Sequence, residues 1–295
     1  MISTRIEWAS KTWNPITGCP RPKISPGCEH CYAERMAKRL AGRFGYDAVD
    51  PFKITFHPER LKEPVGLKVP QRIFVGSMGD MFHPGVLYRD LDLVLAVAAL
   101  TPQHTYMFLT KRPAMMLEYM TGERKNGDEG ITSGAVYDAA FSDRQWRYFA
   151  EVPSWKTIRP EWSWKWPLPN VWLGVTVCTH DELHKIQTLL DVPAVRHFVS
   201  LEPLLENIDL DPYTHLLDWV ICGGETGHNA RPMHPSWVKS LRDQCQNVGI
   251  PFFFKDWGEY FLAPGDEPHF VRFAPGGKRT FGRLLDGKEW NEVPV

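Results

Sequence analysis

Short apolar runs alternate with longer helix-like stretches along most of this chain. Each apolar run covers about five or six residues of nearly continuous hydrophobicity, which is typical of strands buried on both faces. The stretches between them have the length and apolar spacing of helices. The predicted strands are 72–76, 105–110, 171–176, 196–201, 218–222 and 250–254, and the predicted helices are 31–42, 87–100, 113–121, 180–190 and 235–247.

Strands that alternate with helices predict an α/β fold with a parallel sheet. Because there are about six such units, we expect a partial or full parallel (β/α) barrel of the TIM-barrel kind, and an open doubly wound sheet is the alternative. Residues 1–262 would form this barrel domain. The chain then becomes rich in Gly and Pro, with a turn at 274–278, which predicts a small β-hairpin-like cap over 263–295.

A long, turn-rich insertion at about 122–169 interrupts the alternation and carries five tryptophans. Between 144 and 166, basic residues outnumber acidic ones by five to two. Aromatic rings interleaved with Arg and Lys can stack on bases and bind phosphates, so this segment is a candidate nucleic-acid contact. The alternative is a small aromatic core that anchors the insertion.

The composition sets the class of protein and leaves its partner open. With 43% hydrophobic and 23% charged residues among 295, the chain can bury a full core. Its formal net charge of −1 gives no general attraction to nucleic acid or to an anionic membrane. The sequence shows neither a signal segment nor an apolar run of membrane-spanning length, so we expect a cytoplasmic protein with reduced thiols and no membrane partner.

Each predicted strand ends in polar residues. In a barrel the loops after the strands build the active face, so these side chains would meet at one mouth. Helix caps and loop turns are the alternative explanation for any single group. The candidate catalytic residues are Lys111, Glu202, Glu225 and Lys255, and Asp80 and Arg112 are the other charged residues at strand ends.

Three cysteines, Cys19, Cys28 and Cys31, form a C-x8-C-x2-C cluster just before a predicted helix. Three thiolates on a 4Fe–4S cube leave one iron open to bind a small molecule, whereas a closed structural zinc site needs four ligands. A zinc site completed by a histidine, and the absence of any metal, remain alternatives. The fourth zinc ligand would be His30, His57 or His83, and the remaining cysteines, Cys178, Cys222 and Cys245, are expected in the core.

A series of short motifs spans nearly the whole chain. They include Ile6-Glu-Trp8, Thr12-Trp-Asn-Pro15, Cys31-Tyr-Ala-Glu34, Ser200-Leu-Glu-Pro-Leu204, Ile221-Cys-Gly-Gly-Glu225, Arg231-Pro-Met-His-Pro235 and Gly282-Arg-Leu-Leu-Asp-Gly287. Together with the cysteine cluster, these motifs resemble the phage-associated three-cysteine-motif proteins, a family of phages, prophages and bacterial genomes. That family is in turn similar to radical S-adenosylmethionine enzymes.

This resemblance implies a cofactor set. Cys19, Cys28 and Cys31 would hold a 4Fe–4S cluster whose open iron binds S-adenosylmethionine, with His30 near the adenine. Asp80 and Arg112 would contact the amino and carboxylate groups of the methionine part. Two features depart from the usual pattern: the first cysteine interval is eight residues instead of three, and the literal Gly-Gly-Glu, at 223–225, follows a later strand than usual.

The resulting expectation is an iron–sulfur enzyme that cleaves S-adenosylmethionine reductively and abstracts hydrogen from a substrate. A reductant protein would be needed, and the phage association suggests a nucleic-acid-related substrate. No motif encodes the substrate itself. The alternative function is a nucleic-acid-binding module, stabilised by zinc or by a cluster, without catalysis.

Overall fold

The structure is a computed structural model that describes residues 2–4, 6–20, 22–122, 132–141, 165–263, 269–272 and 282–295. Within these limits the chain forms two compact units. The first comprises Met1–Pro22, Tyr32–Leu173 and Asp191–Arg196, and the second comprises Lys23–Cys31, Gly174–Leu190 and His197–Val295. The three clustered cysteines are therefore divided, with Cys19 in the first unit and Cys28 and Cys31 in the second.

The first unit is built on parallel strands. The edge strand β1 (Ile2–Ser3) pairs antiparallel with β2 (Lys11–Trp13), and β5 (Arg72–Val75) then pairs parallel with β2 and with β6 (Thr105–Thr110). A separate antiparallel pair joins β3 (Ile16–Thr17) to β4 (Thr55–Phe56). The inward side chains of these strands are fully buried: Trp13, Ile73, Val75, Tyr106 and Phe108.

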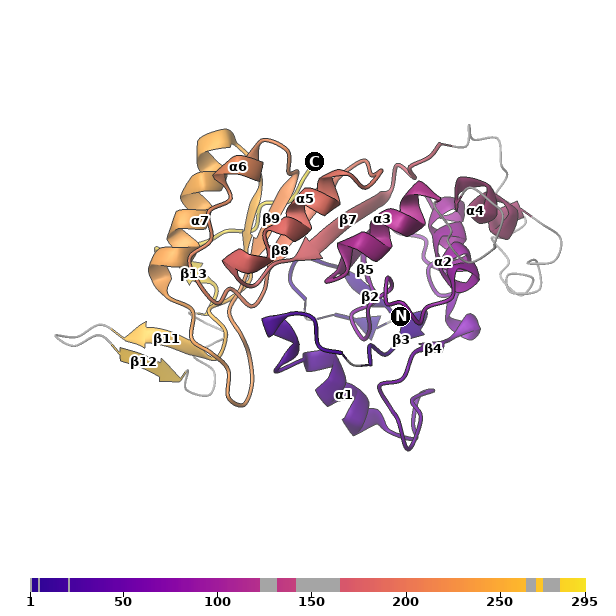
Figure 1. The fold of residues 1–295 in the computed structure, drawn as a ribbon, viewed down its shortest axis with the longest axis horizontal. Helices are drawn as coiled ribbons and strands as arrows, with labels where there is room; N and C mark the ends of the chain where they lie inside the picture. Colours follow the sequence, from indigo (N-terminus) through magenta and orange to yellow (C-terminus); the bar gives the residue numbers. More distant parts are fainter. Residues whose placement is uncertain are drawn as a thin grey trace. The chain divides into compact units, whose positions relative to one another are not determined.

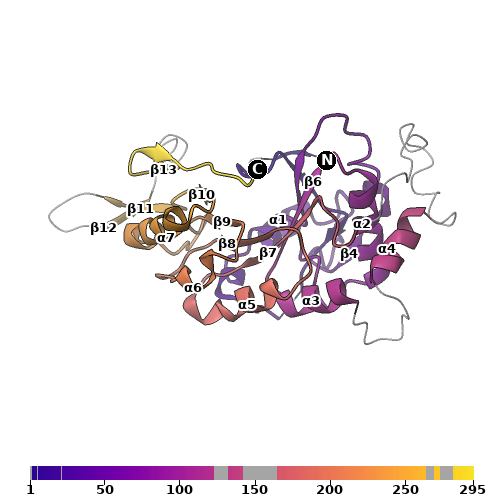
Figure 2. The ribbon, with the colours of Figure 1, turned by 90° about the horizontal axis from the view of Figure 1, so that it is seen from above.

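Four helices belong to this unit: α1 (Tyr32–Leu40), α2 (Tyr88–Leu100), α3 (Pro113–Thr121) and α4 (Thr132–Phe141). Helix α2 is buried along most of its length and lies beside α4 in both views (Figure 1, Figure 2). Helix α3 begins at a proline, which suits the first helical position, and ends at the left-handed Gly122. A 3-10 turn, η2 (Pro58–Arg60), precedes β5.

The second unit continues the pattern. Strand β7 (Val171–Thr176) begins in the first unit and ends in this one, followed by β8 (His197–Leu201), β9 (Trp219–Cys222) and β10 (Phe252–Phe254). Strand β9 pairs parallel with both β8 and β10, and all of its side chains are buried. The cysteine-bearing turn η1 (Pro26–Cys28), the turn η5 (His180–Glu182), and the helices α5 (His184–Leu190), α6 (Asp211–Thr214) and α7 (Pro235–Val248) complete the α/β part.

Two small hairpins follow. Strand β11 (Tyr260–Ala263) pairs with β12 (His269–Arg272), and β13 (Leu284–Leu285) pairs with β14 (Lys288–Glu289). The β11–β12 pair is seen as two adjacent arrows in Figure 1. Strand β11 crosses the boundary expected at 262, and the turn expected at 274–278 lies outside the described residues. The separate C-terminal cap therefore stays a prediction.

The predicted mixed α/β fold with a parallel sheet is confirmed. Seven parallel strands follow one another in the order β2-β5-β6-β7-β8-β9-β10, with β1 antiparallel at the edge. This order runs in one direction along the chain, as in a partial barrel, whereas a doubly wound sheet reverses its order at a switch point. The order does not close into a ring among the described strands, so the partial barrel is the version supported.

The predicted strands and helices agree with those of the structure. All six predicted strands and all five predicted helices are present with shifts of a few residues at their ends. Helix α4 was not predicted, and it lies inside the expected insertion; residues 142–164, which hold most of the candidate nucleic-acid segment 144–166, lie outside the described part. Among the described helices, none has both the length and the apolar character needed to cross a bilayer.

Candidate functional site

The six cysteines fall into two groups, and all six are thiols rather than disulfide sulfurs. Cys178, Cys222 and Cys245 are fully buried, which confirms that they belong to the core. Desolvation raises the pKa of Cys222 well above its ordinary value and that of Cys245 to about 12. These two buried thiols are therefore protonated and unreactive at neutral pH. Cys19, Cys28 and Cys31 are only partly buried.

Cys19 is held in place by close backbone packing. The preceding Gly18 has a φ of +91°, and a Cβ there would lie 2.0 Å from the carbonyl oxygen of Lys53. The Gly18 amide donates to the carbonyl of Met78 at 2.9 Å, and the Cys19 amide donates to the carbonyl of Phe52 at 3.1 Å. Only glycine fits at this point, so the position of Cys19 depends on it.

A buried carboxylate at the end of β5 organises the surroundings of Cys19. Asp80 accepts hydrogen bonds from the Phe82 amide at 3.0 Å, the Thr110 hydroxyl at 2.7 Å, the Lys111 amide at 3.4 Å and the Arg112 guanidinium at 3.0 Å. We call Cys19, Asp80, Thr110 and Arg112 the Asp80 cluster. Its carboxylate joins the ends of β5 and β6 and has two donors on each oxygen.

Arg112 connects this carboxylate to the thiol. Its Nη1 lies 3.0 Å from Asp80 Oδ2 and 3.3 Å from Cys19 Sγ, and its side chain is only 9% exposed. Burial opposes the charged guanidinium, but the attractions of Asp80 and Cys19 outweigh it, and the pKa of Arg112 is raised. A permanent cation beside a sulfur favours the thiolate, which is the nucleophilic and metal-binding form.

The histidines proposed as a fourth zinc ligand in this unit are already engaged. His83 Nε2 lies 3.2 Å from the Pro20 carbonyl oxygen, and its Nδ1 accepts from the Gly85 amide at 3.0 Å. His57 Nε2 lies 2.9 Å from the Thr17 hydroxyl. Burial, followed by the positive charge of a nearby arginine, lowers the pKa of both rings, so both are neutral at pH 7. Either histidine would have to give up such a contact to bind a metal through that nitrogen.

The segment that carries Cys28 and Cys31 is anchored at its start by Ser25. The Ser25 hydroxyl caps η1 by accepting from the Gly27 amide at 3.3 Å, and it lies 3.7 Å from Cys178 Sγ. Ser25 also donates to the buried carboxylate of Glu182, which accepts from the Cys178 amide at 2.7 Å. This segment therefore rests on buried polar groups of the second unit.

A second anchor forms where β9 ends. Glu225 accepts from the backbone amide of Arg231 at 2.8 Å and from its guanidinium at 2.9 and 2.6 Å, and it contacts His30 Nδ1 at 3.1 Å. The same guanidinium donates to the Pro26 carbonyl at 2.9 Å and to the carboxylate of Glu29 at 3.2 Å. We call His30, Glu225 and Arg231 the Glu225 cluster. Arg231 and Glu225 together contact residues that precede and follow Cys28 in the sequence.

Glu225 is ionised at all ordinary pH values. Desolvation opposes its negative charge, but the hydrogen bonds from Arg231 and His30 outweigh that effect and lower its pKa to about 2. The Glu225 side chain is 5% exposed. A carboxylate with these partners acts as an anchor and is poorly suited to proton transfer near pH 7, so the local geometry does not favour the catalytic role expected for it.

Glycines shape the approach to Glu225. A Cβ on Gly224 would lie 2.2 Å from the carbonyl oxygen of Trp257, so the two backbones can approach only because this residue is glycine. The neighbouring Gly223 would place a Cβ 3.3 Å from Lys255 and 3.6 Å from Glu202, the pair that flanks it. The Gly-Gly-Glu sequence is thus explained here by close packing.

Glu202 and Lys255 form an ion pair at the ends of β8 and β10. Their side chains are 25% and 19% exposed, so both charges remain accessible to a ligand from solvent. The pair offers one anionic and one cationic group side by side, with the backbone of Gly223 between them. Such a pair is complementary to a zwitterionic amino-acid group.

The structure thus brings some of the predicted site residues together within each unit. In the first unit Arg112 contacts both Cys19 and Asp80, and the Lys111 amide donates to Asp80; in the second unit His30 contacts Glu225. Among the described residues, no three His, Cys, Asp or Glu side chains are grouped in a way that would hold a metal ion. Joint ligation by Cys19, Cys28 and Cys31, and a common mouth for all strand ends, stay predictions.

Some residues of these clusters were not predicted as site residues. They are Thr110, which donates to Asp80, Arg231 and Glu29, which hold the Cys28 segment, and Glu182 beneath Ser25. Arg231 could have been suspected, since it opens the Arg-Pro-Met-His-Pro motif. Nothing local in the sequence distinguishes Thr110 or Glu182 from ordinary polar residues.

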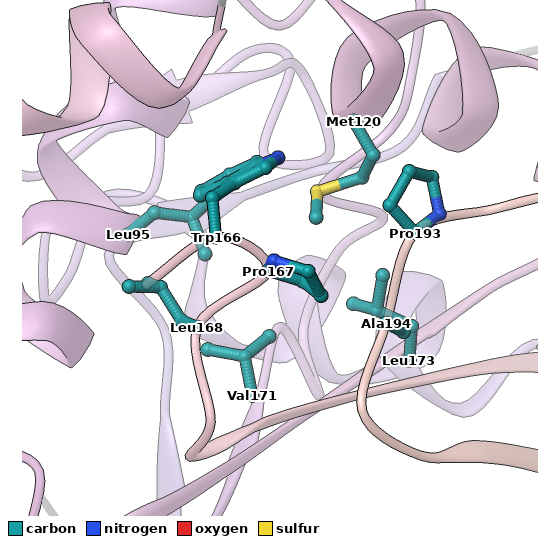
Figure 3. A pocket seen from close by; sticks show the side chains of 9 residues that line it. All are labelled: Leu95, Met120, Trp166, Pro167, Leu168, Val171, Leu173, Pro193 and Ala194. Atoms are coloured by element: carbon teal, nitrogen blue, oxygen red, sulfur yellow. The ribbon is translucent and has the colours of Figure 1, made fainter. Parts of the chain in front are cut away.

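None of these residues lines the crevice found in the first unit. It encloses about 190 Å³ of empty space, part of it open to solvent, and nine apolar side chains line it, among them Leu95, Met120, Trp166 and Leu168 (Figure 3). No titratable side chain lines it. The crevice therefore offers apolar contact and no reactive group.

Comparisons with other proteins give a family and no function. Neither the curated proteins nor the solved structures contain a match to this chain. A family model described as "Protein of unknown function (DUF5131)" matches residues 3–294, which is almost the whole chain. The chain therefore belongs to the DUF5131 family.

Proposed function

We propose that this chain is an iron–sulfur protein in which Cys19, Cys28 and Cys31 hold a 4Fe–4S cluster, and that it acts on S-adenosylmethionine. The observation that carries the proposal is the division of the six thiols, three fully buried and three partly buried within one short segment. Buried thiols suit packing, whereas accessible thiols near cationic groups suit metal binding.

The donor chemistry fits such a cluster. Arg112 favours the thiolate of Cys19, and Ser25, Glu225 and Arg231 hold the segment that carries Cys28 and Cys31. A soft iron–sulfur centre takes thiolate ligands, and hydrogen bonds to the ligand sulfurs tune it. The engaged rings of His57 and His83 weaken both as the histidine of a three-cysteine, one-histidine zinc site, and His30 is the remaining candidate for that alternative.

The proposed contacts with S-adenosylmethionine are revised by the local geometry. Asp80 already accepts four hydrogen bonds, so its carboxylate is poorly placed to receive the methionine amino group. Glu202 and Lys255 are accessible and oppositely charged. We therefore assign the amino group to Glu202 and the carboxylate to Lys255, while His30 keeps its proposed position near the adenine.

A cluster held by Cys19, Cys28 and Cys31 would supply the one electron that splits S-adenosylmethionine, with methionine as the leaving group, and so allow hydrogen abstraction from a substrate. The residues of this chain have separate tasks in that scheme. Arg112 keeps Cys19 deprotonated, Arg231 and Glu225 position Cys28 and Cys31, and the Glu202–Lys255 pair orients the amino-acid group. The partners are a reductant protein and a substrate, for which the resemblance to phage proteins suggests a nucleic-acid-related molecule.

The test begins with anaerobic reconstitution. Wild-type protein supplied with iron and sulfide should become brown, with about four iron and four sulfide per chain. Cys19→Ala, Cys28→Ala and Cys31→Ala should each lose this loading, whereas Cys178→Ala, Cys222→Ala and Cys245→Ala should retain it. A colourless protein with one zinc per chain would refute the cluster and favour the zinc-stabilised alternative.

The second stage tests the cofactor. Adding S-adenosylmethionine to the reduced protein should change the paramagnetic resonance of the cluster and yield 5′-deoxyadenosine slowly, even without substrate. Lys255→Met should weaken this response while leaving the iron content unchanged. An intact cluster whose spectrum ignores S-adenosylmethionine would leave an electron-transfer or structural role instead.

A further inference from the structure

A tight turn follows α1 in the first unit, and its residues are Arg43 to Tyr46. The Tyr46 amide donates to the Arg43 carbonyl at 3.0 Å, which closes the turn. Its two central residues, Phe44 and Gly45, have φ values of +54° and +83°. Two positive φ values in succession define the type I′ turn, in which Asn, Asp and Gly dominate because other side chains are strained there.

Phe44 is the unexpected residue in this conformation. The other non-glycine residues with positive φ in the described chain are Asn229 and Asp286, which are the types that tolerate it. Asp286-Gly287 forms the two-residue connection between β13 and β14, with φ values of +52° and +75°. The chain thus contains the same backbone turn twice, once with the favoured residue and once with a bulky aromatic.

Packing does not explain the phenylalanine. Its side chain is 73% exposed, so the ring gains little from removal of apolar surface from water. The residue therefore combines an unfavourable backbone conformation with an exposed apolar ring. Residues held in sparsely populated conformations often serve a function outside the fold itself.

Neighbouring residues hold the backbone of this turn in place. Arg60 donates to the Phe44 carbonyl at 2.7 Å and to the Asn14 carbonyl at 2.9 Å. A Cβ on Gly45 would lie 2.7 Å from the ring of His57, so the turn is pressed against that side chain. Tyr46 is buried in a small core with Ala37 and Met78. The backbone at Phe44 is therefore held in place, with little backbone freedom left to lose on binding.

Basic residues lie close to Phe44 in the sequence, and two of them are in the last turn of α1. Lys38, Arg39 and Arg43 are all exposed; Lys38 pairs with Glu34 at 2.8 Å, and Arg43 donates to the Arg39 carbonyl at the end of the helix. The nearest acidic residue along the loop, Asp47, is neutralised by Lys53. A fixed exposed aromatic beside exposed guanidinium groups matches the pattern that binds single strands, in which bases stack and phosphates pair with cations.

We propose that this turn is a binding site for single-stranded nucleic acid, with a base stacked on Phe44 and the adjacent phosphates on Arg39 and Arg43. This site is independent of the proposed cluster chemistry and of the segment 144–166. An anionic membrane would also attract the cations. A single ring gives it little apolar area to insert, however, whereas stacking on one base needs only one ring.

The test measures binding of a fluorescent dT20 strand by anisotropy at fixed ionic strength, together with thermal stability. Phe44→Asn should weaken binding by about tenfold or more, since one base stack is lost. The same change should raise Tm or leave it unchanged, because Asn suits the turn. A merely structural phenylalanine would lower Tm on substitution, so the two readouts separate the roles. Arg39→Gln and Arg43→Gln should each reduce the slope of affinity against salt concentration.

Val49→Asn is the matched control, because Val49 is 93% exposed, lies in the same loop region and is not part of the turn. Its binding of dT20 should equal that of the wild type. The proposal is overturned if the wild-type protein binds no single strand, if duplex DNA binds equally well, or if Phe44→Asn binds unchanged. If Phe44→Asn loses binding to anionic vesicles but binds dT20 unchanged, the turn is a membrane-binding surface instead.

Discussion

The Asp80 and Glu225 clusters use the same pair of groups for different purposes. In each, a buried carboxylate at a strand end holds an arginine, and in each a glycine that tolerates no side chain precedes a cluster residue. Arg112 is almost fully buried and contacts the sulfur of Cys19. Arg231 is 31% exposed and contacts the peptide segment around Cys28 instead.

This difference separates the charge of a thiol from its position. A guanidinium against a sulfur changes the protonation of that sulfur. A guanidinium on a neighbouring carbonyl and carboxylate limits the movement of the segment. Removing the two arginines should therefore have opposite effects on cysteine reactivity.

The largest expected effect comes from the glycines. Gly18→Ala and Gly224→Ala would each force a Cβ to within 2.0 to 2.2 Å of a carbonyl oxygen, so the backbone must move. We expect each to lose on the order of 3 kcal/mol or more of stability. Urea unfolding measures this loss. Gly134→Ala is the control, because a Cβ there would meet nothing within 4 Å and should be tolerated.

Glu225→Gln should have the next largest effect, and it should depend on pH. The folded pKa of Glu225 is depressed from 4.5 to about 2, so the carboxylate contributes stability that is fully present above about pH 4.5 and is lost as pH falls through 2. After discounting for the partial exposure of Arg231, this amounts to about 2 kcal/mol. Unfolding free energies from pH 2 to 7 should fall less steeply with acid in the variant. Equal slopes would disprove the anchor.

Arg231→Gln should accelerate alkylation of Cys28 and Cys31 in the metal-free protein, because the segment loses its contacts with Glu29 and Glu225. We expect a rise of about three- to tenfold, measured by iodoacetamide labelling and mass spectrometry. Cys19 serves as the internal reference and should react as before. Arg231→Lys keeps the charge without the forked geometry, so its alkylation rates should lie between those of the wild type and of Arg231→Gln.

Arg112→Gln should act in the opposite direction on Cys19. Without the guanidinium the thiolate is less favoured, so alkylation of Cys19 should slow by a few-fold at pH 7 and its rate profile should move to higher pH. The labelling rates of Cys28 and Cys31 provide the reference. A faster reaction of Cys19 would mean that Arg112 shields the sulfur sterically and does not activate it.

The smallest effects belong to the core thiols. Cys222→Ala and Cys245→Ala should each cost about 1 kcal/mol of packing energy or less, with metal content unchanged. Thermal unfolding together with iron analysis checks both. Loss of iron in Cys222→Ala comparable to that in Cys28→Ala would show that the division of the thiols into two groups is wrong.

Much of the fold could be predicted because its signals are local. The runs that became β7, β9 and β10 are continuously apolar, and α7 is bounded by Pro235 and by the left-handed Gly249. Helix α4 escaped prediction because it lies in the stretch interpreted as a turn-rich insertion. The position of Asp80, Arg112, His30 and Glu225 at strand ends or beside a cysteine made them site candidates, and their role in a site stays a prediction. Their hydrogen-bond partners could not be predicted from the sequence.

The alternation of strands and helices, the parallel sheet, and the division between clustered and core cysteines could all be predicted from the amino-acid sequence. These follow from short-range periodicity and from the burial that an apolar run requires. Other contacts are visible only in the folded chain: Glu225 contacts His30, 195 positions away, Arg231 contacts Glu29, and Arg112 contacts Cys19. Such contacts depend on how backbone segments that are far apart in the sequence pack together. At Gly18 and Gly224 the missing Cβ lets two segments of the chain approach each other, and no local sequence pattern records that approach.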